Sequence, residues 1–271
     1  MSGMKKGHIS VIMATYNCAD TLKESIDSIL AQTYTDWKFI ICDDCSTDNT
    51  YEILKKYESE HPDKFLIIKN DKNSKLPFSL NHCLKYADGE FCARMDGDDY
   101  VSPERFEKQV KFLQENPDTH LVGCNLQVFD DNGLGRIIRC KDEPQEIDLL
   151  DTPCFPHAAI MTYTSVYNEL GGYTVSPRTV RAQDYDLWFR FFAKGFKGRN
   201  LHEPLYFMRE DANAFLRRKP KQYLWLMVTK WKGYSLLKFP GRYYWHILLT
   251  LLAMIRNEFR KLKAAIFNKN K

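Results

Sequence analysis

The chain has 271 residues, which fits one large domain with an appended segment better than two full domains. With 44% hydrophobic and 27% charged residues, and no internal repeat, it is neither a disordered chain nor a repeat protein. The net charge of +4 hides an asymmetry, because residues 1–211 carry a balance of −9 and residues 212–271 a balance of +13. We therefore predict two physically different regions, a catalytic domain at 1–211 and a basic tail at 212–271.

Strand and helix patterns alternate through the first half of the chain. Apolar runs predict buried strands at residues 9–13, 38–42, 65–68 and 90–94. Apolar residues three and four apart predict helices at residues 21–30, 48–59, 76–86 and from 102 onward. This order and spacing indicate an α/β fold with a Rossmann-like, mostly parallel central sheet and flanking helices.

Two of these helices have recognisable start signals. Thr21-x-x-Glu24 has the spacing of a capping box, in which the two side chains bond each other's backbone amides. Ser102 is a good N-cap residue, and Pro103 suits the first helical position. The second half is less regular, with strands predicted at 120–129 and 135–140, a helix at 183–194, and a helical tail from about residue 219.

The eight cysteines are scattered, and the apolar run after Lys5 and Lys6 is too short for a secretory signal. We therefore expect reduced thiols in a cytoplasmic chain rather than a disulfide framework. Cys42-x-x-Cys45 has half the spacing of a zinc site, but no second Cys or His pair accompanies it. A structural zinc ion is accordingly not predicted.

Polar residues follow three of the predicted strands, where an open parallel sheet binds ligands. Asp96, Asp98 and Asp99 place three carboxylates in four residues, and such a cluster repels itself unless a cation joins it. Mg²⁺ or Mn²⁺ would suit these oxygen ligands together with a substrate diphosphate. Asp44 could accept the imide N–H of a uracil ring, and Tyr16 could stack on that ring. The alternatives are a solvated acidic turn and a half-buried loop tyrosine.

Two further residues are candidates in the second half. Asp184 opens the predicted helix at 183–194 and could act as a general base if it contacts an acceptor hydroxyl. Alternatively, it is only a charge at the N-terminus of an amphipathic helix. His157 precedes the apolar run Ala158 to Met161, where a histidine is more often structural than an acceptor or phosphate contact.

Three stretches of the sequence resemble the family 2 glycosyltransferases, which have the A-type glycosyltransferase fold. They are ISVIMATYNCADTLKESIDSILAQTYTDWKFIICDDCSTDNT, NSKLPFSLNHCLKYADGEFCARMDGDDYVSPERFEKQV and GGYTVSPRTVRAQDYDLWFR. They occur in the family's order and cover about residues 8 to 210. Within the family, the sequence is most similar to bacterial transferases that build lipopolysaccharide, capsule or other surface polysaccharides.

The resemblance implies inverting transfer of a hexose or N-acetylhexosamine from a UDP-sugar to a glycan or lipid-linked glycan. It implies that Ala14, Tyr16, Asp44 and Asp96 bind the nucleotide. It also implies that Asp98 and Asp99 bind the metal and that Asp184 is the catalytic base.

The chain departs from the family pattern at two positions. Gln183 stands where many members have Glu, which affects how the acceptor is oriented. Lys75 stands where the usual pattern has Gly, and it is either a phosphate contact or a solvated side chain.

The tail lies beyond the resemblance. An apolar stripe recurs at steps of three and four through Leu248, Leu251, Leu252, Ile255, Phe259, Leu262 and Ile266. Its apolar core is too short to span a bilayer and suits an interfacial helix, and the positive surplus would attract anionic lipid. We predict peripheral attachment to the inner face of the cytoplasmic membrane. The alternative is that the stripe packs on the catalytic domain or on a second subunit.

Three other interpretations fit the sequence less well. A nucleotidyltransferase would usually show a Gly-rich, basic loop after the first strand, which Ala14 to Asn17 lack. A nucleic-acid-binding protein could use the basic, aromatic tail, but the acidic main body would repel nucleic acid, so no nucleic-acid partner is expected. An inactive relative is disfavoured because every carboxylate that the mechanism needs is present.

Overall fold

The computed structural model describes residues 4–211 and 214–269, with side chains described to residue 265 apart from residues 214 and 215. These residues form two compact units. Unit 1 holds the described parts of Met1–Pro144, Cys154–Tyr173 and Phe196–Glu210. Unit 2 holds the described parts of Gln145–Pro153, Thr174–Gly195 and Asp211–Lys271. The predicted boundary at residue 211 therefore coincides with one of the chain's crossings between the units.

The described strands all belong to unit 1 and form one sheet in the order β3-β2-β1-β4-β8-β6-β9-β5, with β7 beside β6. Their bounds are β1 (Lys5–Thr15), β2 (Trp37–Asp43), β3 (Phe65–Lys69), β4 (Gly89–Arg94), β5 (Tyr100–Val101), β6 (Leu121–Asp130), β7 (Gly133–Ile138), β8 (Met161–Tyr163) and β9 (Gly198–Arg209). The first four strands in sequence pair in parallel, whereas β8 is antiparallel to both of its neighbours. The predicted α/β fold is confirmed, and its sheet is parallel in the first half and mixed in the second.

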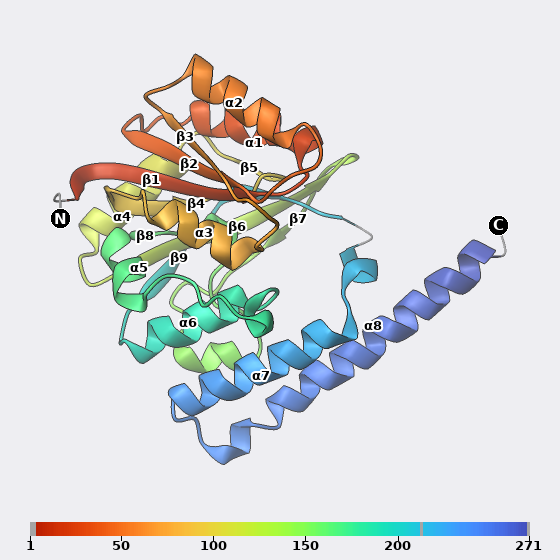
Figure 1. The fold of residues 1–271 in the computed structure, drawn as a ribbon. Helices are drawn as coiled ribbons and strands as arrows, with labels where there is room; N and C mark the ends of the chain where they lie inside the picture. Colours follow the sequence, from red (N-terminus) through yellow and green to blue (C-terminus); the bar gives the residue numbers. More distant parts are fainter. Residues whose placement is uncertain (1–3, 212–213, 270–271) are drawn as a thin grey trace. The chain divides into compact units, whose positions relative to one another are not determined.

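Helices cover both faces of the sheet in unit 1. They are α1 (Ala19–Leu30), α2 (Thr50–Glu60), α3 (Leu76–Leu84), α4 (Arg105–Glu115) and α5 (Thr164–Leu170). In Figure 1, α1 and α2 lie above the parallel strands and α3 lies below them. Alternate residues of β1 explain this arrangement, because Ile9, Val11 and Met13 belong to the core that α1, α2 and α4 complete.

Two predicted helix starts were wrong. Helix α1 begins at Ala19, so Thr21 lies inside its first turn, and its hydroxyl donates to the carbonyl of Gly97 at 2.8 Å. Helix α4 begins at Arg105, because the amide of Arg105 closes a turn onto the carbonyl of Ser102 at 3.0 Å. In both cases a tertiary or turn bond replaces the local cap that the sequence suggested.

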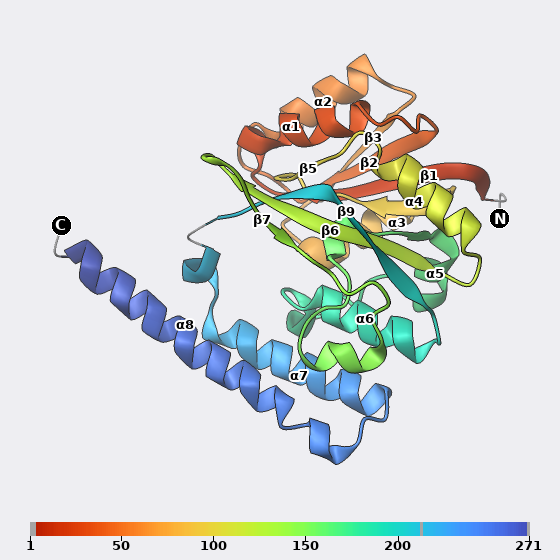
Figure 2. The same cartoon turned by 180° about the vertical axis from the view of Figure 1, so that it is seen from behind.

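Strand β9 was not predicted from the sequence. It runs beside β6, as the view from behind shows, and β7 flanks the other side of β6 (Figure 2). The pairing of β6 with β9 shifts register on both sides of Asn125. The irregular, polar middle of β9, His202-Glu203-Pro204, hides the strand's apolar pattern. The short strands β5 and β8 were likewise not predicted, although a run ending at Met161 was recognised as apolar.

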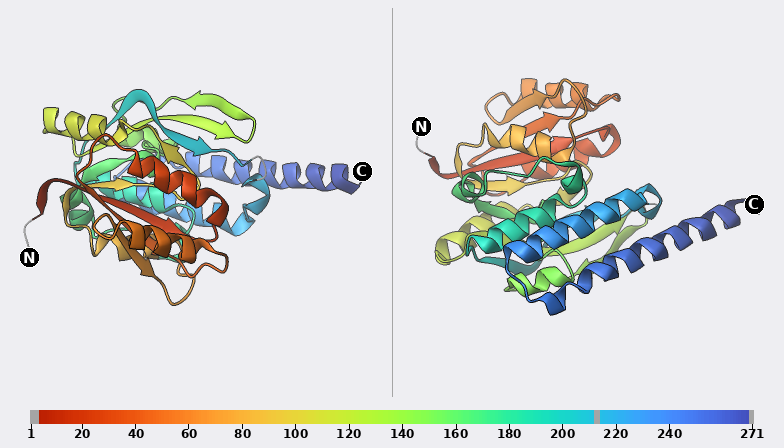
Figure 3. Two further views of the ribbon diagram at one scale, coloured as in Figure 1. Left: turned by 90° about the horizontal axis from the view of Figure 1, so that it is seen from above. Right: turned by 60° about the horizontal axis from the view of Figure 1, so that its bottom comes forward.

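Unit 2 is built from helices. They are η1 (Glu146–Leu150), η3 (Pro177–Thr179), α6 (Gln183–Ala193), η4 (Ala214–Arg217), α7 (Pro220–Leu236), η5 (Gly241–Tyr243) and α8 (His246–Lys269). Helices α6, α7 and α8 lie in this order, side by side, in the right panel of Figure 3. Helix α7 approaches α6 closely, since a Cβ built on Gly233 would lie 2.1 Å from the ring of Phe189.

Helix α8 presents an unusual distribution of side chains. Its buried positions are Ile247, Thr250 and Asn257, two of which are polar. Most of the predicted apolar stripe is exposed, including Leu252 at 60% and Phe259 at 62%. The side chain of Ile266 lies outside the described residues. No helix in the described part of the chain combines the length and the apolar character needed to cross a bilayer.

Candidate functional site

Strand register aligns the predicted donor residues at the carboxyl ends of the parallel strands. Ala14 pairs with Cys42 across β1 and β2, so Tyr16 and Asp44 follow at the same level. On the other side of β1, the amide of Met95 donates to the carbonyl of Ile12, which places Asp96 next to Ala14 along the sheet. We call Ala14, Tyr16, Asp44 and the turn 96–99 the donor edge.

Hydrogen bonds tie the loops of the donor edge together. The side chain of Asn17 accepts the Thr47 amide at 2.8 Å, which joins the loop after β1 to the loop after β2. Asn17 has a φ of 51°, a left-handed conformation that Asn tolerates well. The turn after β1 leaves Tyr16 48% exposed, so its ring is open to a stacking partner.

The carboxylate of Asp44 is buried and organises the loop before α3. One oxygen accepts the Ser74 amide at 2.7 Å and the Asn70 side-chain amide at 2.8 Å, and the other accepts the Lys75 amide at 2.8 Å. The oxygen that faces Lys75 accepts one hydrogen bond from the described residues, and a carboxylate oxygen can accept two. Asp44 can therefore hold this loop and still accept one further N–H.

Lys75 occupies a backbone conformation that favours glycine. Its φ of 74° and ψ of 161° lie in a backbone region that is nearly restricted to glycine. Any other residue adopts this conformation at a cost of about 1–3 kcal/mol. A glycine at this position would adopt the conformation without this cost. The Lys75 side chain is exposed, and its backbone amide is the group that binds Asp44.

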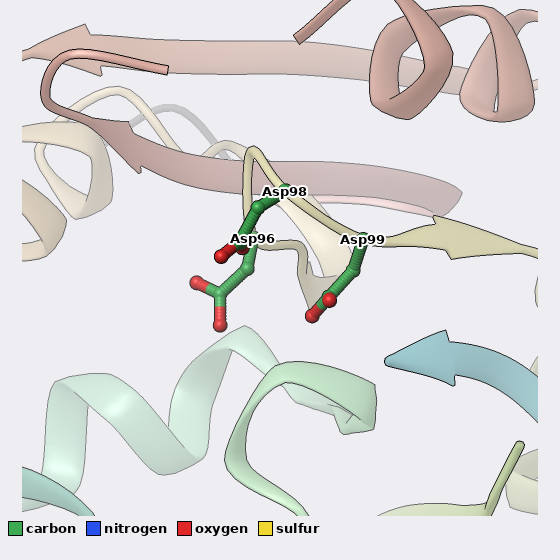
Figure 4. Close-up of side chains that lie close together, drawn as sticks. All are labelled: Asp96, Asp98 and Asp99. Atoms are coloured by element: carbon green, nitrogen blue, oxygen red, sulfur yellow. The ribbon is translucent and has the colours of Figure 1, made fainter. Parts of the chain in front are cut away.

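The turn 96–99 brings three carboxylates together. One oxygen from each of Asp96, Asp98 and Asp99 lies within 4.8 Å of the others. Figure 4 shows the three carboxylates on one side of the turn, with those of Asp96 and Asp98 nearest each other. This set of oxygen atoms suits a hard divalent cation, which prefers oxygen ligands. A bound cation would also offset the repulsion between the neighbouring carboxylates.

The three carboxylates differ in their surroundings. The carboxylate of Asp96 accepts hydrogen bonds from both terminal nitrogens of Arg94, at 2.6 and 3.2 Å, and Arg94 is only 2% exposed. Asp99 is buried and accepts the Tyr206 hydroxyl and the Arg209 amide, each at 2.8 Å. Asp98 is the exposed member, so it has the most direct access to a solvent cation.

Burial and the neighbouring carboxylates of the turn raise the pKa values of Asp98 and Asp99. Burial, followed by the charges of Asp96 and Asp98, raises the pKa of Asp99 to about 8. Although Asp98 is exposed as a residue, the surrounding turn removes part of the water around its carboxyl, and this, followed by the charge of Asp96, raises its pKa above the ordinary value. Both shifts follow from burial and from repulsion between the neighbouring carboxylates.

His157 lies in η2 (His157–Ala159) of unit 1. Its Nε2 is 2.9 Å from the Tyr173 hydroxyl, which in turn lies 2.8 Å from the Tyr167 hydroxyl. Burial and the nearby Arg94 charge hold the pKa of His157 well below its usual range. A neutral imidazole in a tyrosine network supports the structural alternative and offers a hydrogen bond rather than a charge.

Asp184 lies in unit 2, in the first turn of α6. One of its oxygens accepts the neighbouring Tyr185 amide at 2.8 Å. Two residues further on, Asp186 fixes this end of the helix through the Thr174 hydroxyl at 2.6 Å and the guanidinium groups of Arg178 and Arg190. Asp184 lines a pocket that Arg218, Gln222, Tyr223 and Leu226 of the tail also line.

Comparison with known proteins identifies the family. Residues 10–220 match the model of the family described as Glycosyl transferase family 2. The chain belongs to this family. It is 43% identical over 260 residues to the "Putative glycosyltransferase EpsE" of Bacillus subtilis (strain 168), covering 93% of each chain.

One further sequence relative and one solved structure are also similar to this chain. The Escherichia coli protein named "UDP-Glc:alpha-D-GlcNAc-diphosphoundecaprenol beta-1,3-glucosyltransferase WfaP" is 29% identical over 214 residues, covering 79% of this chain and 82% of that protein. The solved mannosyltransferase PcManGT from Pyrobaculum calidifontis, in complex with GDP-Man and Mn²⁺, superposes with a TM-score of 0.64 at 18% identity, covering 96% of this chain and 73% of that chain. This structural similarity shows a shared fold.

Several residues that shape this family 2 site were not found from the sequence. Arg94 holds Asp96, and its position at the end of a buried strand was a usable signal, because a buried charge needs a partner. Tyr206 and Arg209 hold Asp99 from β9, a strand that the sequence pattern did not reveal. Arg181 and Arg218, which line the pocket beside Asp184, gave no pattern at all.

Proposed function

We propose that this family 2 glycosyltransferase moves a hexose or N-acetylhexosamine from a UDP-sugar to a hydroxyl of a glycan or lipid-linked glycan, with inversion at the anomeric carbon. The observation that carries the proposal is the alignment of the donor edge, where strand register brings a nucleoside-binding pair and a carboxylate cluster together. The name of WfaP supports a UDP-linked donor and a lipid-linked acceptor. The proposed role is in the synthesis of surface polysaccharide, such as lipopolysaccharide or capsule.

The nucleoside binds, in this proposal, at the loops after β1 and β2. The exposed ring of Tyr16 stacks on the uracil, and the backbone at Ala14 lines its edge. Asp44 accepts the imide N–H with the hydrogen-bonding capacity that its loop contacts leave. The diphosphate then lies toward Asp96, with Lys75 as a cationic contact on the opposite loop.

A divalent metal ion, Mn²⁺ or Mg²⁺, is the proposed cofactor, with Asp98 and Asp99 as its protein ligands. When bound, such an ion neutralises negative charge on the leaving diphosphate. Arg94 keeps Asp96 in place beside these ligands. The Mn²⁺ in the PcManGT complex, which has the same fold, supports the choice of ion.

Asp184 is the proposed catalytic base. Its carboxylate takes the proton of the acceptor hydroxyl while that oxygen attacks the anomeric carbon. The bond from this carbon to the diphosphate oxygen breaks, and UDP leaves with the electron pair. Attack from the face opposite the leaving group inverts the anomeric configuration. His157 would add a neutral hydrogen bond on the acceptor side or to phosphate.

The experiment that tests this function is a transfer assay with a panel of UDP- and GDP-linked sugars and an N-acetylglucosamine diphospholipid acceptor, with Mn²⁺ or EDTA. We expect metal-dependent transfer from one UDP-sugar and a product of inverted configuration by NMR. Transfer only from GDP-sugars would contradict the donor assignment, and a product of retained configuration would contradict the mechanism.

The tail supports a second part of the proposal, peripheral binding to an anionic membrane surface. Its stripe is exposed rather than packed on the described protein, with Leu248, Leu252, Ile255, Phe259 and Leu262 all open to solvent. Residues 212–271 also carry a balance of +13. Exposed apolar side chains with a basic surplus suit an interfacial helix on the cytoplasmic face of the membrane.

Vesicle co-sedimentation tests the membrane proposal. We expect binding to phosphatidylglycerol vesicles, weaker binding to phosphatidylcholine, and loss of binding in the Leu252→Glu, Phe259→Glu double variant. Leu134→Glu is the matched control, because Leu134 is equally exposed but lies on β7 of unit 1. Salt-sensitive binding to an oligonucleotide but not to anionic vesicles would replace the membrane with nucleic acid as the tail's partner.

A further inference from the structure

A pocket of about 440 Å³ lies entirely within unit 2, and residues from the family domain and the tail line it together. Asp184 and Tyr185 come from the first turn of α6. Arg218 precedes α7, and Tyr223 and Leu226 lie on it. The tail therefore completes the surroundings of the proposed base.

Two arginines give this pocket its charge. Arg181 and Arg218 both line it, and within the described residues neither has a carboxylate at ion-pair distance. Neighbouring Arg217 is different, because its guanidinium pairs with Asp211. Burial, followed by repulsion from Arg217 and Arg218, lowers the pKa of Arg181. Asp184 adds one carboxylate to the same lining, without an ion-pair contact to either arginine. Two guanidinium groups that are not ion-paired favour a ligand with two negative charges.

The pocket walls are fixed by contacts of α7 with η1, η3 and α6. Lys230 is buried, donates to the carbonyl of Leu150 at 3.1 Å, and lies 5.1 Å from the ring centroid of Tyr185. The Thr229 hydroxyl donates to the carbonyl of Arg178 at 3.2 Å. Because both bonds bind the tail to segments that flank α6, the arginines are presented by a packed surface rather than by a free end.

From this arrangement we infer that the pocket is the acceptor site and that Arg181 and Arg218 bind a diphosphate group of the acceptor. Arginine guanidinium groups bind phosphate oxygens in pairs, which gives geometry as well as charge. The apolar side of the pocket, formed by Pro153, Tyr223 and Leu226, would contact the first lipid unit or the sugar. The inference rests on the proposed role of Asp184, since the acceptor hydroxyl must reach that carboxylate.

Calorimetric titration of two soluble probes tests the site. The probes are inorganic diphosphate and geranyl diphosphate, both in EDTA so that the metal-dependent donor edge cannot hold them. We expect both to bind the wild type, geranyl diphosphate more tightly because of the apolar wall. Arg181→Gln and Arg218→Gln should each weaken binding about tenfold. Arg256→Gln is the matched control, an exposed arginine of the same unit outside the pocket.

The outcomes separate this inference from the proposed function. Absence of diphosphate binding to the wild type, or unchanged affinity in both pocket variants, would overturn the inference. Tighter binding of inorganic than of geranyl diphosphate would also overturn it, because the site would then hold a free anion. Asp98→Asn should keep geranyl diphosphate binding, while loss of UDP binding in that variant reports on the donor edge alone.

Discussion

The donor edge of unit 1 and the arginine-lined pocket of unit 2 have opposite charge. Three carboxylates gather at the turn 96–99, whereas the pocket holds two guanidinium groups without carboxylate partners among the described residues. Each cluster is unfavourable by itself, because like charges repel. The difference fits the two proposals made above, a cation and nucleotide-sugar donor at the donor edge and an anionic acceptor at the pocket.

The largest expected effect concerns the proposed base. Asp184→Asn should lower the rate of transfer about 10³-fold, because the amide cannot accept the hydroxyl proton. UDP binding should stay unchanged, since the donor edge uses other residues. Single-turnover transfer and calorimetry on the same preparation would check both results. An Asn variant that kept more than a tenth of the wild-type rate would remove Asp184 from the mechanism.

The next effect is on the stability of unit 2. Asp186→Asn should lower the free energy of unfolding by about 3 kcal/mol, because it leaves Arg178 and Arg190 without their buried carboxylate. Urea denaturation at neutral pH measures this change. An Asn variant as stable as the wild type would show that these ion pairs do not hold α6.

The two ion pairs of Asp186 also make the stability of the protein depend on pH. Burial opposes ionisation of Asp186, but the Thr174 hydrogen bond and the charges of Arg190 and Arg178 outweigh it and lower the pKa. The stabilisation is therefore complete above the ordinary carboxyl pKa of about 3.9 and is lost as the pH falls through the lower folded value. The difference between wild type and Asp186→Asn should shrink at low pH, and a constant difference would contradict this account.

A smaller effect tests how the tail joins α6. Gly233→Ala should destabilise the protein by about 2 kcal/mol, because the added methyl group meets the ring of Phe189. Alanine would otherwise favour a helix by about 1 kcal/mol, so the sign of the effect is diagnostic. Gly241→Ala is the control, since nothing lies within 4 Å of its built Cβ. Thermal denaturation of both variants decides the point, and equal stability would disprove the close contact.

The smallest effect separates strain from function at Lys75. Lys75→Gly should raise the free energy of unfolding by about 1 kcal/mol, because glycine adopts this backbone conformation without strain. If the side chain contacts phosphate, UDP binding should weaken in the same variant. Lys72→Gly provides the comparison at an exposed position of the same loop without a positive φ. A destabilised Lys75→Gly protein would contradict the assignment of strain.

Local patterns were enough to predict the first half of the fold and the gathering of acidic side chains at one edge of the sheet. Buried strands, amphipathic helices and polar strand ends alternate there, so Asp44 and the turn 96–99 could be placed at one edge. Strand β9 could not be predicted, because its pairing with β6 is long-range and irregular. For the same reason, the sequence could not predict the hydrogen bonds that Asp99 accepts from Tyr206 and Arg209 of β9.

The tail shows a different limit of sequence reasoning. Periodicity predicted its helices and its apolar stripe. The exposure of Leu252 and Phe259 is compatible with the proposed binding of this stripe to a membrane surface. Periodicity could not predict that Tyr223 and Leu226 of α7 would line a pocket with Asp184, because that contact depends on tertiary packing. The assignment of residues 1–211 as the catalytic domain and 212–271 as a tail stays a prediction, now with a shared pocket to explain.

The most direct test of the account is calorimetric titration of UDP into the wild type and Asp98→Asn, each with Mn²⁺ and with EDTA. The account predicts that the wild type binds UDP with Mn²⁺, that EDTA weakens this binding, and that Asp98→Asn loses the metal-dependent part. Asp118→Asn, an exposed carboxylate away from the turn 96–99, should behave as the wild type. UDP binding that neither EDTA nor Asp98→Asn affects would contradict the assignment of the acidic turn as the metal and diphosphate site.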